Sequence, residues 1–324
     1  KALSLTLSLG ERGQMHCSLS PRERAGERVL HIWSHVMSTR QLESLPSSFS
    51  MYPKALLNSL KKKSSSSTLP DLIINLKNSA IDRQHLAAYN TVCGFGQSDT
   101  LSPTYLHMLV MPLQMALMIE DGFPFPLLGL VHIANKITQY RPVNASEKVD
   151  VSCRFGEVKA HDKGQQFTLL AEVHIGNELV WAEETIYLFR QATAKTGDVK
   201  TESEKPKATA PVFNALWSIP ADIGRRYAAV SGDSNPIHLY NMTAKLFGFP
   251  RAIAHGMWSK AHCLSMYEGR LPNAFVVDVQ FKLPVLLPAK VGFQTAVNSK
   301  VETHFAVLDA KSGKPHLAGM IKAL

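Results

Sequence analysis

The chain has 324 residues, of which 45% are hydrophobic and 19% charged, a globular balance that excludes a mainly disordered chain, a collagen or a coiled coil. Its formal net charge is +9, but residues 1–70 hold ten Lys and Arg against four Asp and Glu, and the rest is close to neutral. We therefore predict no nucleic-acid partner, because a nucleic-acid-binding protein should carry its positive charge as a patch on the folded domain.

The cysteines and the hydropathy pattern indicate a cytoplasmic protein. The four cysteines lie far apart, at positions 17, 93, 153 and 263, and form no CxxC pair. Such spacing fits a reducing compartment rather than a disulfide framework or a zinc module. The most apolar stretch, residues 105–133, is interrupted by polar and charged residues, so we predict no transmembrane helix and no membrane partner. The N-terminus lacks the order of a secretory signal.

Residues 1–69 do not have the pattern of a folded domain. The stretch 9–26 is similar to the conceptual translation of a repetitive intergenic element, and position 1 is not Met. We hypothesise an over-extended gene model, with synthesis starting at Met51 or Met37 and residues 1–50 not translated. The run Lys-Lys-Lys-Ser-Ser-Ser-Ser at 61–67 predicts a solvated linker. We therefore expect 1–69 to be a disordered or non-native extension. A nucleic-acid arm or a mitochondrial presequence is less favoured, and the four glutamates of the segment count against a presequence.

The remainder of the chain divides into two parts of domain size. Residues 191–210 are charged and contain a single branched apolar residue, which is typical of a linker. The flanking parts, 70–190 and 211–324, share short matches in the same order, which indicates a diverged internal duplication. The matching pairs are 89–94 with 227–232, 106–107 with 254–255, and 136–142 with 282–288.

Both parts are expected to have the same α+β layout. A polar, turn-rich segment precedes an apolar helix, at 108–119 in the first part and 256–267 in the second. Alternating or β-rich runs then predict antiparallel strands, and a helix packed on such a meander is an α+β arrangement. The predicted strands cover residues 149–155, 167–175, 179–189, 274–281, 290–297 and 305–308, with a hairpin turn at 176–177.

The segment 227–258 holds the residues best suited to chemistry. Asp233 and His238 flank Asn235-Pro236 in a predicted turn, where a carboxylate and an imidazole could converge on one water molecule. Gly256 begins the following helix, where bare backbone N–H groups stabilise developing negative charge. The spacing alone leaves a structural alternative open, in which Asp233 caps the turn and His238 is a hydrogen-bonded core histidine.

These motifs resemble those of a known family. Ser-Gly-Asp-Ser-Asn-Pro-Ile-His at 231–238, Ala-His-Gly-Met at 254–257 and Phe-Lys-Leu-Pro-Val at 281–285 are similar to the hydratase motif of MaoC-like proteins, which include (R)-specific type 2 enoyl-CoA hydratases and acyl dehydratases. The resemblance covers 211–324 closely and 70–190 more loosely. It implies a double hot-dog fold, in which each of two units wraps an antiparallel sheet around a central helix.

The resemblance also implies roles for individual residues. Asp233 and His238 would activate the water that adds to Cβ of a trans-2-enoyl thioester, or run the reverse dehydration, and the N–H of Gly256 would bind the thioester carbonyl. Substrate contacts are expected from Asn235, His255 and Met257. The implied substrate is an acyl-CoA or acyl-carrier-protein thioester, without a metal or a redox cofactor. Whether the chain pairs further as a homodimer stays open.

The sequence departs from the family pattern within the second half. Ala261 stands six residues after His255, where the family often has Ser, so that a helper hydrogen bond would have to come from elsewhere, for example Ser259. For the phosphates of a carrier arm, the basic residues near the motif are Lys245, Arg251 and Lys282.

The first half lacks the catalytic residues. The internal repeat places Phe95 where the second half has Asp233, Met108 where it has Gly256, and His107 where it has His255. We expect this half to be inactive and to complete the sheet. Its Met-rich helix would be core with some acyl-pocket wall, because Met side chains adapt to irregular spaces.

Two other functions remain as alternatives to a hydro-lyase. One is a non-catalytic module that binds an acyl thioester, against which the presence of both Asp233 and His238 counts. The other is a thioesterase on the same fold, which would need a carboxylate on the central helix, and residues 256–267 contain none.

Overall fold

The computed structural model describes residues 8–9, 15–16, 37–60, 68–127, 129–191 and 212–324. The chain forms two compact units, Lys1–Ser38 and Thr39–Leu324. In the first unit, β1 (Ser8–Leu9) pairs antiparallel with β2 (Met15–His16). The second unit contains the large sheet and all seven described helices, and the site lies within it.

The large sheet shows the internal duplication directly. Its eleven strands follow the order β3-β4-β6-β7-β8-β5-β10-β13-β12-β11-β9. Two five-stranded halves, β4-β6-β7-β8-β5 and β10-β13-β12-β11-β9, meet at the antiparallel pair β5–β10, and β3 adds an eleventh strand at the outer edge beside β4. Equivalent strands take mirrored places on the two sides of this pair, as a duplicated unit requires. The bounds are β3 Ser38–Leu42, β4 Leu72–Ser79, β5 Leu130–Gln139, β6 Val149–His161, β7 Gly164–Ile175, β8 Glu178–Arg190, β9 Ala215–Ile219, β10 Phe275–Phe281, β11 Ala289–Val297, β12 Glu302–Asp309 and β13 Pro315–Ala323.

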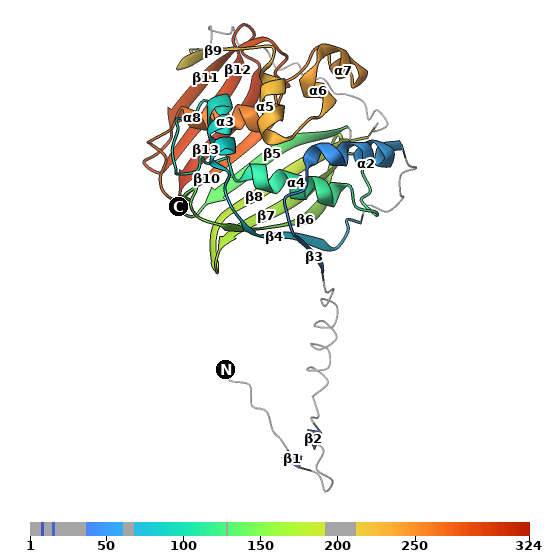
Figure 1. The fold of residues 1–324 in the computed structure, drawn as a ribbon. Coiled ribbons are helices and arrows are strands. Elements are labelled where there is room, and N and C mark those ends of the chain that lie inside the picture. Colours follow the sequence, from blue (N-terminus) through green and yellow to red (C-terminus); the bar gives the residue numbers. More distant parts are fainter. Residues whose placement is uncertain (1–7, 10–14, 17–36, 61–67, 128, 192–211) are drawn as a thin grey trace. The chain divides into compact units, whose positions relative to one another are not determined.

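Each half places one central helix against its strands. Figure 1 shows α4 (His107–Met118) across the strands of the first half and α8 (Gly256–Ser265) across those of the second. All but one of the residues of α4 are buried, which explains why its sequence is apolar on every side. The other helices are α2 Ser48–Leu60, α3 Arg83–Cys93, α5 Ile223–Ser231, α6 Pro236–Leu239 and α7 Asn241–Leu246. The predicted α+β double hot-dog architecture is confirmed.

The turn-rich starts that we predicted for the two halves are wrong. Each half begins with a strand and a short helix, β4 and α3 in the first and β9 and α5 in the second. These two helices bury only one side, so their polar sides concealed the helical period. The two central helices, the six predicted strands and the 176–177 turn agree with the structure, whereas β3, β4, β5, β9 and β13 of the large sheet were not predicted.

The extension predicted at 1–69 also needs correction, because the large unit begins at Thr39. Strand β3 extends the sheet beside β4, and α2 packs against α4. Helix α2 buries Met51 and Ala55, at 7% and 0% exposure, so it contributes to the core and cannot be a detached leader. The predicted linkers at 61–67 and 191–210 lie outside the described residues, apart from position 191.

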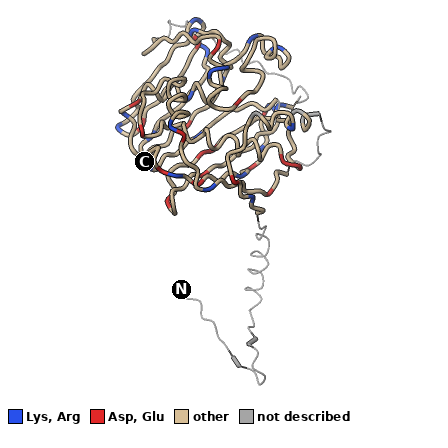
Figure 2. Tube along the Cα trace, viewed as in Figure 1, with Lys and Arg blue, Asp and Glu red and all other residues tan. Residues whose placement is uncertain are grey.

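The described residues give two further observations on surface character. No described helix is both long and apolar enough to cross a membrane. Acidic and basic positions are both scattered along the tube of Thr39–Leu324 (Figure 2), in line with the near-neutral balance of this part of the sequence.

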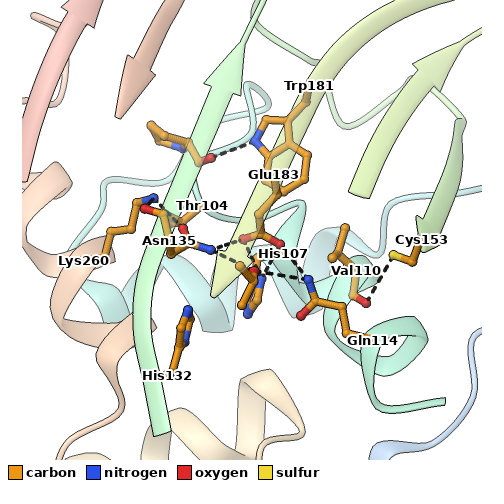
Figure 3. Close-up of polar contacts among 12 residues, drawn as sticks. Thr104, His107, Val110, Gln114, His132, Asn135, Cys153, Trp181, Glu183 and Lys260 are labelled. Atoms are coloured by element: carbon orange, nitrogen blue, oxygen red, sulfur yellow. Dashed lines mark hydrogen bonds and ion pairs between the residues drawn. The ribbon is translucent and has the colours of Figure 1, made fainter. Parts of the chain in front are cut away.

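A buried polar network joins the two halves at β5 and β10. Lys260 of α8 is fully buried, and its Nζ donates to Asn135 Oδ1 at 2.5 Å, to Asn135 O at 3.1 Å and to Val277 O at 3.4 Å. Asn135 Nδ2 in turn donates to Glu183 Oε1 at 2.7 Å. Glu183 is 2.9 Å from His107 Nδ1 and also accepts from Gln114, so that Asn135 lies between Lys260 and Glu183 (Figure 3).

Burial and pairing have opposite effects on the pKa values of Lys260 and Glu183. Burial lowers the pKa of Lys260 to about 7, although attraction to Glu183 and Asp278 opposes that shift. Burial alone would raise the pKa of Glu183, but the charge and hydrogen bond of His107, with Asn135 and Lys260, bring its pKa below the usual value. The network therefore keeps its carboxylate ionised and makes its lysine easy to deprotonate.

The lowered pKa of Lys260 predicts a pH-dependent stability. Between about pH 7 and the unfolded pKa of roughly 10.4, unfolding takes up a proton, so the free energy of unfolding rises with pH by at most about 1.4 kcal/mol per unit. We expect Lys260→Met to lose this slope, and urea unfolding from pH 7 to 10 measures it. Exposed Lys322→Met is the control and should keep the slope. Parallel curves for wild type and Lys260→Met would contradict the prediction.

Candidate active site

The turn between α5 and α6 sets the directions of Asp233 and His238. Helix α5 ends at Gly232, whose φ of 73° is a left-handed conformation that favours glycine and turns the chain away from the helix axis. Helix α6 then begins after Asn235, whose side chain accepts from the N–H of Ile237, with Pro236 in the first helical position. Asp233 consequently lies in the bend and His238 lies on the short helix, on the same side of it.

The carboxylate of Asp233 is held by hydrogen bonds to one oxygen. Oδ1 accepts from the N–H of Asn235 at 3.1 Å and from the hydroxyl of Tyr52 at 3.0 Å. Oδ2 lies 3.7 Å from His255 Nε2. The side chain of Asp233 retains 37% exposure, so a carboxylate oxygen is accessible from the adjoining cavity.

The two histidines have fixed tautomers, because each binds a carbonyl oxygen that can only accept. His238 Nδ1 donates to Ile253 O at 2.8 Å, which leaves the lone pair of His238 on Nε2. His255 Nε2 donates to Asp233 O at 3.0 Å, which leaves its lone pair on Nδ1. The two rings stack, with centroids 3.7 Å apart. His238 therefore offers a proton acceptor, while His255 holds the backbone of Asp233.

Burial and mutual attraction set the charges of these groups. Burial raises the pKa of Asp233, but attraction to His255 and His238, together with the bonds from Asn235 and Tyr52, brings it below its usual value. Burial lowers the pKa of His238, against the opposing effect of Asp233. Burial and His238 lower the pKa of His255 to about 3. At neutral pH the site thus combines an ionised carboxylate with two neutral imidazoles.

Two glycines allow close packing around these groups. A side chain at Gly224 of α5 would collide with the carbonyl oxygen of His238, so this glycine lets α5 and α6 approach. A Cβ at Gly256 would lie 3.0 Å from the ring of Phe281. Gly256 is the first residue of α8, where N–H groups have no partner within the helix, and no described residue accepts a hydrogen bond from its N–H.

A cavity of about 790 Å³ opens onto Asp233, His238 and Gly256, and residues of both halves line it. Asp233 is the only acidic residue among the described lining residues, and it shares the cavity with several cationic or titratable groups. These are Lys163 and Arg190 from the first half, Lys282 from the second, and the histidines at 107, 132, 161, 238, 255 and 316. The electrostatic character therefore suits a substrate with an anionic portion.

All six predicted site residues line this one cavity: Asp233, Asn235, His238, His255, Gly256 and Met257. Ser259 also lines it, but its hydroxyl donates to His255 O at 3.2 Å. Of the three basic residues expected to bind phosphates, Lys282 lines the cavity, Arg251 lines a separate one of about 490 Å³, and Lys245 lines neither.

Some residues at the site were not predicted from the sequence. Tyr52 had no local signal, because its partner Asp233 is 181 residues away. Lys163 lies in the turn between β6 and β7, and Arg190 ends β8. The pairing of β5 with β10 and the packing of α3 on α5 and α8 bring this half beside the motif, and no local pattern in the sequence predicts these contacts. His107, the counterpart of His255 in the first half, also lines the cavity, and it pairs with buried Glu183.

The site could also be considered as a metal centre. Asp233, His238 and His255 each offer a ligand atom, and these atoms lie within 4.8 Å of one another. However, Nδ1 of His238 and Nε2 of His255 are committed as donors to carbonyl groups. A metal could take only the opposite nitrogens, and His255 Nδ1 is fully buried. The donor set therefore fits proton transfer better than metal coordination.

Comparisons with known proteins show the family to which the chain belongs. The model of the MaoC like domain matches residues 192–318, so the family match begins within the segment predicted as a linker. The 3-hydroxyacyl-thioester dehydratase X of Mycobacterium tuberculosis is 37% identical over 256 residues, which cover 79% of this chain and 91% of that protein.

Solved structures of dehydratases are also similar to this chain. The crystal structure of HtdX from Mycobacterium tuberculosis has a TM-score of 0.69 and 34% identity, covering 78% of this chain and 100% of that one. A MaoC-like dehydratase from Phytophthora capsici has a TM-score of 0.62 at 18% identity, covering 78% and 94%, and supports the fold alone. The fold, the motif and the extent of this similarity show that the chain belongs to the MaoC-like dehydratase family.

Proposed function

We propose that this protein is a hydro-lyase that interconverts trans-2-enoyl thioesters and (R)-3-hydroxyacyl thioesters. The observation that carries the proposal is the convergence of Asp233, His238 and the first turn of α8 on one cavity. The family relationship supports it, because the relative from Mycobacterium tuberculosis is named a 3-hydroxyacyl-thioester dehydratase.

The two acceptors have the charge states that activation of water requires. Asp233 is ionised and His238 presents the lone pair of Nε2, so a water between them can donate a hydrogen bond to each. In hydration, Asp233 or His238 takes a proton from this water while the oxygen of the water forms a bond to Cβ. The electrons of the Cα–Cβ double bond move onto the thioester oxygen. The proton then returns to Cα, so that one water is added in total, and dehydration reverses each step.

Gly256 supports the charge that develops on the thioester oxygen. Its N–H is unpaired among the described residues and stands at the positive end of the α8 dipole. A hydrogen bond from this N–H would be strongest to the enolate oxygen, which is the condition for stabilising the transition state rather than the substrate. The ring of Phe281 packs against Gly256 and keeps this position narrow.

The charges of the cavity support a phosphate-bearing carrier on the substrate. Lys163 and Arg190 from the first half and Lys282 from the second line the same cavity as Asp233. A CoA or carrier-protein thioester brings phosphate groups, and basic side chains on both halves could bind them. The first half would then contribute to binding without contributing to the chemistry.

The proposal predicts that the purified protein hydrates crotonyl-CoA or a longer trans-2-enoyl-CoA to the (R)-3-hydroxyacyl product, followed as loss of enoyl-thioester absorbance. Asp233→Asn and His238→Ala should each reduce kcat by about 10²–10⁴-fold, the usual contribution of a general acid–base group. Both variants should keep the fold, as judged by circular dichroism and Tm.

Matched controls use residues outside the lining of the cavity. Asp99→Asn and His304→Ala change exposed ion-pairing side chains and should leave turnover unchanged. Full activity of Asp233→Asn and His238→Ala would refute the assignment. Release of free thiol from acyl-CoA would instead indicate a thioesterase, and thermal stabilisation by acyl-CoA without turnover would indicate a binding module.

The tautomers of the histidines predict that turnover is independent of metal. Dialysis against EDTA should leave kcat unchanged, because His238 and His255 each commit one nitrogen to a carbonyl group and the proposed steps need only proton transfer. Added Zn²⁺ should inhibit, since it would compete with water for Asp233 and His238 Nε2. Activity lost with EDTA and restored by one equivalent of Zn²⁺ would disprove this expectation.

A further inference from the structure

The carboxylate of Asp233 has a partner that lies outside both hot-dog halves. The hydroxyl of Tyr52 donates to Asp233 Oδ1 at 3.0 Å, and Tyr52 belongs to α2, which precedes the first half in the chain. Figure 1 shows α2 beside α4 at the edge of the first half. Tyr52 does not line the cavity, so it reaches the carboxylate without occupying the substrate space.

Helix α2 is held firmly enough to fix the place of Tyr52. Met51 and Ala55 are buried at 7% and 0% exposure, and Asn58 Nδ2 donates to Ile119 O at 3.1 Å beyond the end of α4. Ser48, at the start of α2, is buried at 6% and lies 3.8 Å from Met111 Sδ. Contacts at both ends of the helix therefore limit the positions that the Tyr52 side chain can take.

The hydrogen bond distinguishes the two oxygens of the carboxylate. Oδ1 receives both Tyr52 and the N–H of Asn235, whereas Oδ2 faces His255 Nε2 at the longer distance of 3.7 Å. Two donors on one oxygen prevent the carboxylate from rotating freely about its Cβ–Cγ bond. The oxygen without a short hydrogen bond is then the one available to a water molecule.

Tyr52 can act here only as a donor. Burial raises the pKa of its phenol, and the nearby charge of Asp233 raises it further, far above the physiological range. The phenol therefore keeps its proton and cannot exchange it with the substrate. Its hydrogen bond also contributes to the lowered pKa of Asp233. The two histidines lower this pKa more, and burial raises it.

We propose that Tyr52 is a positioning residue for the dehydratase reaction, which holds Asp233 Oδ1 so that Oδ2 and His238 Nε2 together bind the reacting water. The inference rests on the proposed function and extends it to a helix outside the two hot-dog units. It also gives a function to the contact that α2, which packs against α4 of the first half, makes with the turn that holds Asp233.

The first test is Tyr52→Phe, which removes the hydroxyl and retains the ring. A hydrogen bond to a charged group corresponds to roughly a ten- to hundredfold effect, so kcat should fall by about that factor while KM changes less than about threefold. Asp233 is active as the carboxylate, and loss of a donor raises its pKa. The acidic limb of the kcat/KM profile should therefore move to higher pH.

Two control variants separate positioning from general loosening of the fold. Tyr267→Phe removes a tyrosine hydroxyl that bonds Thr295 Oγ1 at 2.6 Å, away from the cavity, and should leave activity and pH profile unchanged. Asn58→Ala removes one of the contacts that hold α2 but keeps the hydroxyl of Tyr52, so its acidic limb should move less than that of Tyr52→Phe. A fall in kcat for Tyr52→Phe with an unmoved acidic limb, or no change at all, would overturn the proposal.

A second measurement covers the case in which Tyr52→Phe does not fold. Incorporation of 3,5-difluorotyrosine at position 52 retains the hydroxyl and makes it a stronger donor, so the acidic limb should move to lower pH. An unshifted limb in the folded fluorinated protein would exclude the positioning role.

A third measurement separates this inference from the proposed reaction. Carboxyl-carbon NMR of aspartate-labelled protein, assigned with Asp233→Asn, reports the pKa of Asp233 without any substrate. A higher pKa in Tyr52→Phe supports the contact even if wild type fails to hydrate any enoyl thioester, and in that case only the proposed function is refuted. An identical pKa in both proteins refutes the role of Tyr52 while the proposed function stands.

Discussion

The fixed position of α8 depends on how the protein accommodates a buried lysine. An unpaired ammonium inside a protein costs several kcal/mol, so Lys260 must find acceptors or lose its proton. It finds them on β5 and β10, the two strands where the halves meet, through Asn135 and the carbonyl of Val277. This bonding ties the middle of α8 to the junction of the sheet. The start of α8, with His255 and Gly256, is therefore fixed relative to both halves.

The same network shows how the polar contacts of the two halves differ. His107 occupies the position in the first half that His255 occupies in the second, but His107 is paired with buried Glu183. Removing either partner would leave a buried charge or donor unsatisfied, so the pair is structurally constrained. In the second half the corresponding histidine instead binds the backbone of Asp233. The first half therefore has a buried polar pair, His107 and Glu183, whereas in the second half the equivalent histidine binds a turn that carries the exposed carboxylate of Asp233.

The sequence predicted what local signals determine. Gly232, Asn235 and Pro236 specify a turn through their own backbone preferences, and the apolar run of α4 specifies a buried helix. Contacts distant in sequence were not predictable in this way. Strand β5 carries the buried polar residue Asn135, whose side-chain hydrogen-bond partners, Lys260 and Glu183, are distant in sequence. Helices α3 and α5 were not predicted from the sequence, because a short helix that buries only one side has few periodic apolar positions.

Tyr52 shows why composition alone does not define the boundary of the folded part in the N-terminal segment. Residues 61–67 have the composition of a linker and residues 1–50 lack a domain pattern, so composition predicts a boundary at residue 69. Yet α2 needs no core of its own, because it buries its apolar side against α4. An ionised carboxylate beside two neutral imidazoles requires donors, and the turn supplies only the N–H of Asn235 to Oδ1. The electrostatics of Asp233 therefore give a physical reason for a tyrosine from outside the duplicated fold to pack against it.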